Sequence, residues 1–266
     1  MNNELLHITI VQPDIVWENK VANLLQYEEM ISGIAATRQV VALPEMFSTG
    51  FSMATERLAE PMDGKTVRWM ADMALKYRCI LTGSLIIEED KKYYNRMLWV
   101  QPDGKIGYYD KRHLFAYAHE DKHYTRGETR LITQVNGWRI NLQVCYDLRF
   151  PVWARNQGGE YDVLLYVANW PEQRILAWKT LLQARAIENQ CYVVGVNRVG
   201  RDAKNNNYTG DSSVFGPLGE KIWQQANEAA CHTVALDKEL LRKVRTDLPF
   251  LNDADSFFFY LIETTL

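Results

Sequence analysis

The stretch DVLLYVANWPEQRILAWKTLLQARAIENQCYVVGVN, residues 162–197, decides the fold class of this chain. It begins with an apolar run within Asp162–Asn169, which is typical of a strand covered on both faces. A stripe of apolar side chains at helical spacing follows: Ile175, Trp178, Leu182 and Ala186. The stripe predicts a helix over Gln173–Asn189, and a second apolar run predicts a buried strand over Tyr192–Asn197. Strands that alternate with helices indicate an α/β protein.

The same alternation continues toward both ends of the chain. Leu5–Gln12 and Val40–Glu45 have the pattern of strands, and the residues between them predict a helix over Trp17–Ala36. The Asn136-Gly137 pair is the strongest short signal for a hairpin. No repeat or flexible linker interrupts the pattern, so we expect a single domain over residues 1–266. Periodicity does not decide between one sheet and two.

Composition limits the classes of function. The chain has 266 residues, 47% of them hydrophobic, so we expect a large core that needs no metal or disulfide. Lys and Arg number 30 and Asp and Glu number 33, which gives a formal charge of −3. This balance argues against nucleic acid as a partner, because its binding needs a surplus of cations. A local basic pocket for a small anion remains compatible with it.

The four cysteines, at positions 79, 145, 191 and 231, lie far apart. No pair has the CxxC spacing of a zinc ribbon or redox site, and secreted disulfide scaffolds contain more cysteine. The segment MNNELLHITIVQ has neither a cationic start nor a long apolar run, so we expect no signal peptide. Apolar runs elsewhere are far shorter than the ~20 residues of a membrane helix. We therefore expect a cytoplasmic protein with no membrane partner.

The segment His119–His123, HEDKH, formally matches HExxH, in which a helix places two imidazoles beside a zinc ion. A zinc peptidase that uses His119 and His123 is therefore one hypothesis. Charged residues inside the motif, Gly127 soon after it and the lack of an evident third ligand weigh against it. A polar loop or an exposed helix is the simpler interpretation, and we expect no metal and no other cofactor.

Cys145 has the position of a nucleophile. It stands in QVCYDLRFP, residues 143–151, where a predicted strand ends and a short helix should follow. Such a turn presents the side chain at the sheet edge and directs the next backbone N–H groups toward a developing oxyanion. It also favours the thiolate over the thiol. A buried structural cysteine is the alternative for Cys145, and it is the expected role of the other three.

A nucleophilic cysteine needs a base, and none of the five histidines lies in a segment that clearly points inward. Two other ionisable residues stand at the ends of predicted strands. Glu45 follows VVALP, and Lys111 ends KIGYYDK. Strand ends often carry the functional site of α/β proteins. An exposed charge at the end of a strand is the alternative for each residue taken alone.

Three segments together resemble the nitrilase superfamily of carbon–nitrogen hydrolases: VALPEMFSTGF (41–51), YDKRHLF (109–115) and VCYDLRFPVWAR (144–155). The resemblance assigns that family's Glu–Lys–Cys triad to Glu45, Lys111 and Cys145. VANWPEQR, QARAIEN and TGDSSVFGPLGE also resemble the family, so nearly the whole chain is covered. The resemblance implies a four-layer α-β-β-α sandwich that usually pairs into a homodimer or a larger homo-oligomer.

Within the superfamily, the chain is most similar to the bacterial members of the omega-amidase branch. The short loop from Lys111 to HEDKHYTRG, residues 119–127, carries this similarity. It implies that Glu120 is the second glutamate of the family, which positions the substrate, so the HExxH match has an explanation without metal. One departure is Asn141, where the family often has glycine, on the predicted strand that leads to Cys145.

The resemblance implies a reaction in which a small omega-amide, such as 2-oxoglutaramate or succinamate, is hydrolysed to a carboxylate and ammonia. Cys145 would form a thioester, and Glu45 would move the protons. Lys111 and the backbone N–H of Tyr146 would hold the oxyanion, and Glu120 would orient the amide or Lys111. Water is the second reactant.

The substrate of such a reaction carries a carboxylate, so a cation should meet its far end. Arg149, four residues beyond the proposed nucleophile, is the candidate. Phe47, Tyr146 and Trp170 are the candidates for the apolar walls of the site.

Two alternatives remain beside the zinc peptidase. One keeps the chemistry but takes an N-carbamoyl compound, a nitrile or an aliphatic amide as the substrate. The other is a non-catalytic binding or scaffold protein on the same fold, which the intact Glu45, Lys111 and Cys145 disfavour.

Overall fold

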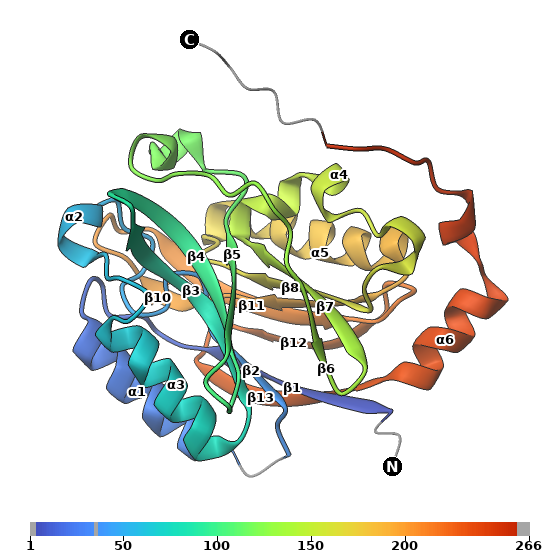
Figure 1. Cartoon of the computed structure of the whole chain (residues 1–266), viewed down its shortest axis with the longest axis horizontal. Helices are drawn as coiled ribbons and strands as arrows, with labels where there is room; N and C mark the ends of the chain where they lie inside the picture. Colours follow the sequence, from blue (N-terminus) through green and yellow to red (C-terminus); the bar gives the residue numbers. More distant parts are fainter. Residues whose placement is uncertain (1–3, 35–36, 260–266) are drawn as a thin grey trace.

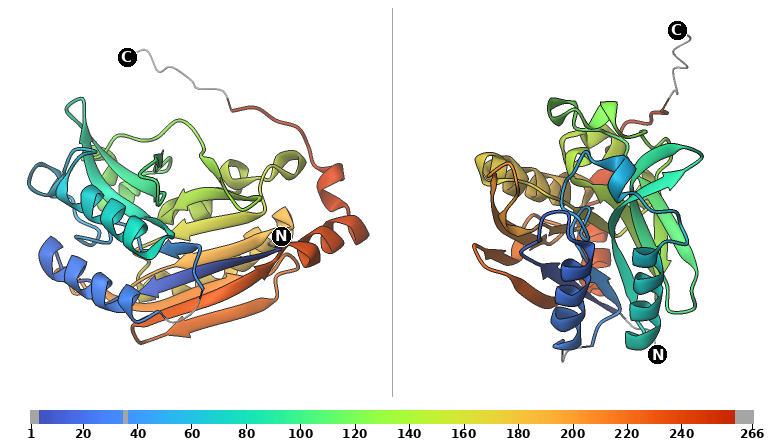
Figure 2. Two further views of the ribbon diagram at one scale, coloured as in Figure 1. Left: turned by 60° about the horizontal axis from the view of Figure 1, so that its bottom comes forward. Right: turned by 90° about the vertical axis from the view of Figure 1, so that its left-hand side faces the viewer.

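Two β-sheets pack face to face, with helices on both outer sides (Figure 1). The computed structural model describes residues 4–34 and 37–259. Two further views show the same layers from other directions (Figure 2). This is the four-layer α-β-β-α sandwich that the family resemblance implied, and it answers the question of sheet number that periodicity left open.

The first sheet has the strand order β13–β1–β2–β3–β4–β5. Strands β1, β2 and β3 run parallel to one another, and the remaining pairings are antiparallel. The bounds are β1 (Leu5–Gln12), β2 (Val40–Ala42), β3 (Ile80–Glu89), β4 (Lys92–Val100), β5 (Ile106–Asp110) and β13 (Ala230–Asp237).

The second sheet has the order β10–β11–β9–β8–β7–β6, and β12 pairs with β11. Strands β7, β8 and β9 run parallel, and β6 and β7 form the hairpin that Asn136-Gly137 predicted. The bounds are β6 (Ile132–Val135), β7 (Trp138–Val144), β8 (Val163–Val167), β9 (Tyr192–Val196), β10 (Val199–Arg201), β11 (Asn207–Phe215) and β12 (Lys221–Ala226).

Helices α1 and α3 cover the first sheet, and α5 covers the second (Figure 1). The bounds of the helices are α1 (Lys20–Ser32), α2 (Thr55–Leu58), α3 (Lys65–Tyr77), α4 (Pro151–Ala154), α5 (Ile175–Asn189) and α6 (Lys238–Asp247). None of the helices in the described part of the chain has the length and apolar character needed to cross a bilayer.

The central strand β8 shows why the sandwich forms. Val163, Leu165 and Val167 face the other sheet in the central core. Leu164 and Tyr166, which alternate with them, face helix α5. Because both faces of the strand are covered by apolar layers, its sequence is an unbroken apolar run instead of an alternating one.

Several predicted boundaries differ from those of the structure. The strand expected over Val40–Glu45 ends at Ala42, because Pro44 has no N–H to continue the regular ladder, although its carbonyl still accepts the Ser84 N–H on β3 at 3.3 Å. The helix expected over Trp17–Ala36 begins at Lys20, because the Asn19 side chain accepts the Ala22 N–H and caps it there. It ends at Ser32, and residues 35–36 lie outside the described residues.

The site residues lie just beyond the ends of four strands. Glu45 follows β2, Lys111 follows β5, Cys145 follows β7 and Asn169 follows β8. The backbone N–H of Asn169 donates to the Glu45 carboxylate, so the ends of strands from both sheets meet at one end of the sandwich. Functional residues are expected at such strand ends in α/β folds.

Candidate active site

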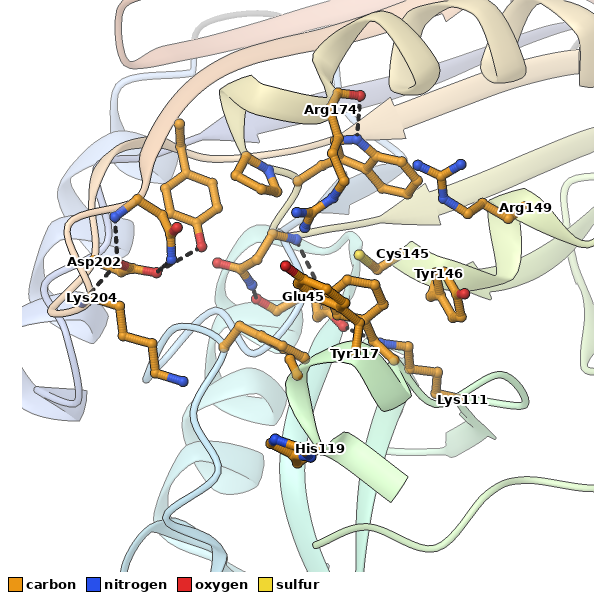
Figure 3. A pocket seen from close by; sticks show the side chains of 18 residues that line it. Glu45, Lys111, Tyr117, His119, Cys145, Tyr146, Arg149, Arg174, Asp202 and Lys204 are labelled. Atoms are coloured by element: carbon orange, nitrogen blue, oxygen red, sulfur yellow. Dashed lines mark hydrogen bonds and ion pairs between the residues drawn. The ribbon is translucent and has the colours of Figure 1, made fainter. Parts of the chain in front are cut away.

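A buried lysine joins two glutamates at this end of the sandwich (Figure 3). Lys111 Nζ lies 2.9 Å from Glu45 Oε1, and it lies 3.0 and 2.9 Å from the two carboxylate oxygens of Glu120. All three side chains are fully buried. Glu45, Lys111 and Cys145 also line one cavity, so three residues that are distant in sequence come together.

The turn at Cys145 is strained and firmly held. Its φ of +46° lies in the left-handed region, which non-glycine residues adopt only when the surroundings fix them. Asp147 supplies this support, because its carboxylate accepts the N–H groups of Val144 and His113 and the hydroxyl of Tyr109, at 2.8 to 3.0 Å. The buried Asp147 thus ties the turn at Cys145 to the segment that carries Lys111.

A folded-back loop brings Glu120 to Lys111. The N–H of Gly127 donates to the Lys111 carbonyl at 2.9 Å, which closes the loop between them. A Cβ at position 127 would lie 2.0 Å from the Asp110 carbonyl oxygen, so only glycine fits there. The N–H of Phe115 donates to Glu120 Oε2 at 2.6 Å and fixes the carboxylate. Glu120 therefore stands behind Lys111, not on the cavity wall.

Burial and the charges of this cluster together oppose ionisation of the Cys145 thiol. Burial and the adjacent Glu45 carboxylate raise the pKa of the Cys145 thiol well above its usual value, and Lys111 offsets this only in part. Burial opposes the charge of Lys111, but Glu120 and Glu45 outweigh it and raise the pKa of Lys111.

The cavity has a volume of about 290 Å³, near the lower end of the range for small-molecule sites. Its walls are largely aromatic, and its mouth carries Arg149 and Arg174 on one side and Asp202 and Lys204 on another (Figure 3). Arg149 lies over the Trp170 ring at 5.1 Å, and Arg174 lies over the Phe115 ring at 5.0 Å. Within the described residues neither guanidinium forms an ion pair with a carboxylate.

Three of the four residues expected to bind the substrate line this cavity: Tyr146, Arg149 and Trp170. Phe47 does not, and its assignment as a wall is wrong. Its fully buried ring packs against Tyr27 and Trp69 between the first sheet and its helices. The left-handed φ of +42° at Met46 breaks the alternation of a strand, so Phe47 does not follow Glu45 into the site.

Replacing Phe47 by alanine is therefore expected to destabilise the protein and to leave substrate affinity nearly unchanged. Loss of a buried phenylalanine costs about 3–5 kcal/mol of unfolding free energy. Urea unfolding measures the first effect, and the KM of the folded variant measures the second. A raised KM with unchanged stability would instead place Phe47 in the substrate site.

The segment around HExxH does not form the helix that such a zinc motif requires. His119 has a left-handed φ of +62°, and only the short 3₁₀ helix Glu120–Lys122 follows. Glu120 is engaged by Lys111. Within residues 4–34 and 37–259, no group of three His, Cys, Asp or Glu side chains could hold a metal ion.

Sequence reasoning did not identify Asn95, Asn169 and Arg174. Asn95 is, with Arg96, one of two polar residues in the buried part of β4, and its amide donates to both glutamates. Asn169 ends the apolar run that follows Asp162, and its side chain donates to the Glu45 carbonyl. A buried asparagine beside an apolar run is a signal that could have marked both. Arg174 carries no such local signal, because it lies just before α5 in a polar segment.

Asn141, the departure from the family pattern, does not reach the cavity. It lies on β7, and its side-chain oxygen accepts a hydrogen bond from Gln143 Nε2 at 3.0 Å. Ile140 and Leu142 on either side of it face the central core, so Asn141 faces the opposite layer. Its effect is confined to packing behind the sheet.

The fold and the cavity define an α/β protein whose small pocket joins a thiol, a buried carboxylate and a lysine, with a second buried carboxylate behind the lysine. The chain belongs to the carbon–nitrogen hydrolase family, whose sequence profile matches residues 7–246. This confirms the superfamily resemblance. The protein is accordingly a hydrolase of carbon–nitrogen bonds other than peptide bonds.

Known proteins similar to this chain include two curated amidases. The chain is 45% identical over 253 residues to the omega-amidase YafV of Escherichia coli strain K12, covering 95% of this chain and 98% of that protein. It is 31% identical to the 2-oxoglutaramate amidase of Bacillus subtilis strain 168, with coverages of 92% and 96%.

A solved structure is similar over the same extent. The crystal structure of a CN-hydrolase superfamily protein from Xanthomonas campestris, with an arsenic adduct in its active site, superposes with a TM-score of 0.94. The two proteins are 41% identical, and the match covers 96% of this chain and 99% of the other.

Proposed function

We propose that this protein is an omega-amidase that hydrolyses the terminal amide of a small dicarboxylate omega-amide, such as 2-oxoglutaramate or succinamate. The observation that carries the proposal is the convergence of Cys145, Glu45 and Lys111 in one small cavity whose mouth is cationic. The similarity to two amidases of this type supports the substrate class.

In the first half of the reaction, Cys145 Sγ attacks the amide carbon while Glu45 takes the thiol proton. The C–N bond then breaks, and Glu45 gives that proton to the leaving nitrogen, so ammonia leaves and a thioester remains. Proton transfer to the nitrogen is required because an amide anion is too basic to leave. Acid–base assistance of this kind contributes about 10²–10⁴-fold to the rate.

The negative charge that develops on the carbonyl oxygen meets Lys111 Nζ and the backbone N–H of Tyr146. The Tyr146 amide stands at the start of the 3₁₀ helix Cys145–Arg149, where N–H groups have no acceptor within the helix. In the second half, water attacks the thioester carbon while Glu45 takes a proton from it. The C–S bond then breaks, Glu45 returns the proton to Cys145 Sγ, and the acid product leaves and ionises to the carboxylate. Glu120 acts in both halves as a positioning residue that holds Lys111.

The far end of the substrate is a carboxylate, and two guanidinium groups are available to bind it. Arg149 is the cation that the sequence suggested, and Arg174 adds a second one. Both are held over aromatic rings, so their positions are restrained while their charges are not neutralised by a carboxylate of the described chain. This arrangement favours an anionic substrate over a neutral amide of the same length.

The proposal is tested by measuring ammonia release from 2-oxoglutaramate, succinamate, butyramide, an N-carbamoyl amino acid and an aliphatic nitrile. The two omega-amides with a free carboxylate are expected to have the highest kcat/KM. A higher value for the carbamoyl compound or the nitrile would favour the alternative in which the chemistry is the same and the substrate differs.

Replacing either Arg149 or Arg174 by alanine is expected to lower kcat/KM for succinamate by about 10- to 100-fold, since a hydrogen bond to a charged group contributes about 1.5–3 kcal/mol. The value for butyramide, which lacks the carboxylate, should hardly change. Arg68→Ala on α3, far from the cavity, is the matched control for loss of one positive charge. An equal loss for both amides would show that the arginines do not recognise the carboxylate.

The proposal retains three expectations about the whole protein. The chain is one domain over residues 1–266, it assembles as a homodimer or larger homo-oligomer, and it works in the cytoplasm. All four cysteines are free thiols, which a reducing compartment would maintain. Light scattering coupled to size exclusion measures the oligomeric state.

A further inference from the structure

Asn95, in the middle of β4, contacts both glutamates of the buried cluster with a single nitrogen. Its Nδ2 lies 2.8 Å from Glu45 Oε1 and 3.1 Å from Glu120 Oε1. Lys111 Nζ contacts the same two oxygen atoms, at 2.9 and 3.0 Å. The two carboxylates are therefore bridged twice, once by an ammonium group and once by an amide.

The direction of the Asn95 amide is fixed by its other neighbour. Asn95 Oδ1 lies 2.7 Å from Ser84 Oγ, and Ser84 Oγ accepts the backbone N–H of Met46 at 2.8 Å. The single hydroxyl proton of Ser84 is then available to donate to Asn95 Oδ1. With the amide reversed, its oxygen would face two carboxylates and repel them, so Nδ2 must face the glutamates.

We propose that Asn95, oriented by Ser84, is a positioning residue that holds Glu45 as the ionised base and fixes its distance from Glu120. Both side chains are fully buried, so water does not substitute for them as hydrogen-bond partners. The inference rests on the proposed function, because Glu45 must accept the Cys145 proton for its ionisation to affect the rate.

The direction in which loss of Asn95 should shift the pH profile follows from the charges around Glu45. The groups that face it are Lys111, Glu120, Cys145 and the phenol of Tyr124, together with the N–H of Asn169. Removing an N–H donor from a buried carboxylate disfavours its charged form. Without Asn95 the ionised base should therefore be less favoured, so the acidic limb of the activity profile should move upward.

The test is the pH dependence of kcat/KM for succinamate in the wild type and in Asn95→Ala, Ser84→Ala and Thr82→Val. In Asn95→Ala the acidic limb should move up by about one to two pH units, so activity on the acidic side of the limb should fall about 10- to 100-fold while the plateau at higher pH changes little. Ser84→Ala, which leaves the amide present but unoriented, should give a smaller shift in the same direction.

Thr82→Val is the matched control, since Thr82 is a fully buried residue on β3, two positions before Ser84, with no hydrogen-bond partner for its hydroxyl among the described residues. Thr82→Val should keep the wild-type pH dependence of kcat/KM. A purely structural role for Asn95 would lower the rate by the same factor at every pH, and that result overturns the proposal. If Asn95→Ala does not fold, the pH profile of Ser84→Ala is the test. An acidic limb of Ser84→Ala that is not shifted overturns the proposal.

A second measurement separates this inference from the proposed function. The rate of alkylation of Cys145 by iodoacetamide, followed by peptide mass spectrometry, needs no substrate and also depends on Glu45 as the base. An upward shift of its acidic limb in Asn95→Ala supports the inference even if succinamate is not hydrolysed by the wild type. An unshifted alkylation profile overturns the inference even if succinamate is hydrolysed.

Discussion

Replacing Cys145 by alanine is expected to lower ammonia release from succinamate by on the order of 10⁴-fold or more. The thioester cannot form without Sγ, and the other thiols cannot replace it. Cys79 and Cys191 lie in the cores behind the first and the second sheet, respectively, and Cys231 is exposed on β13. Initial rates of ammonia release, after subtraction of the uncatalysed rate, measure the loss.

Cys231→Ala is the matched control for this experiment, because it removes a free thiol outside the cavity. It should retain wild-type kcat and KM. Circular dichroism and thermal melting should show that both variants keep the fold. Turnover by Cys145→Ala at the wild-type rate would exclude Cys145 as the nucleophile.

Replacing Lys111 by methionine is expected to damage stability and catalysis together. The change leaves the fully buried Glu45 and Glu120 carboxylates without their ammonium partner. Breaking a buried ion pair in this way costs about 3–5 kcal/mol, which corresponds to a Tm lower by roughly 10 °C. Loss of a donor to the oxyanion should lower kcat by a further 10²–10³-fold in the molecules that remain folded.

The stability of Lys111→Met should depend on pH in a way that distinguishes loss of the ammonium group from a general loss of packing. Without Lys111 the two carboxylates are disfavoured as ions, so the folded variant binds more protons than the unfolded chain. Its stability should therefore be greatest at low pH and should fall as the pH rises above the ordinary carboxyl range of about 4–5. Lys105→Met, at an exposed turn where Lys105 pairs only with Asp103, is the control and should melt like the wild type. Stability of Lys111→Met that is equal to the wild type at neutral pH would contradict the account.

Local patterns were sufficient to predict the alternation of strands and helices and to place the candidate site residues near the ends of strands. The apolar run after Asp162 is continuous since apolar layers cover both faces of β8. Glu45, Lys111 and Cys145 were identifiable since each directly follows a strand or the short turn after one. Family resemblance then supplied the four-layer arrangement, which periodicity alone did not contain.

The remaining parts of the site depend on contacts between distant segments. Phe47 was misassigned because the left-handed backbone at Met46 redirects it, and no sequence pattern marks that conformation. The raised pKa of the Cys145 thiol was not predictable from the local turn, because it depends on burial and on Glu45, which is 100 positions away in the chain. Asn95 was missed because its role exists only where the loop that carries Glu120 folds back over β4.

The central claim is that Cys145 forms a thioester during amide hydrolysis, and hydroxylamine trapping tests it most directly. With saturating hydroxylamine present during succinamate turnover, the wild type should form the succinyl hydroxamate while ammonia release continues without loss. Cys145→Ala should form none. Undiminished ammonia release by the wild type with no hydroxamate would mean that water attacks the amide directly, and this would contradict the account.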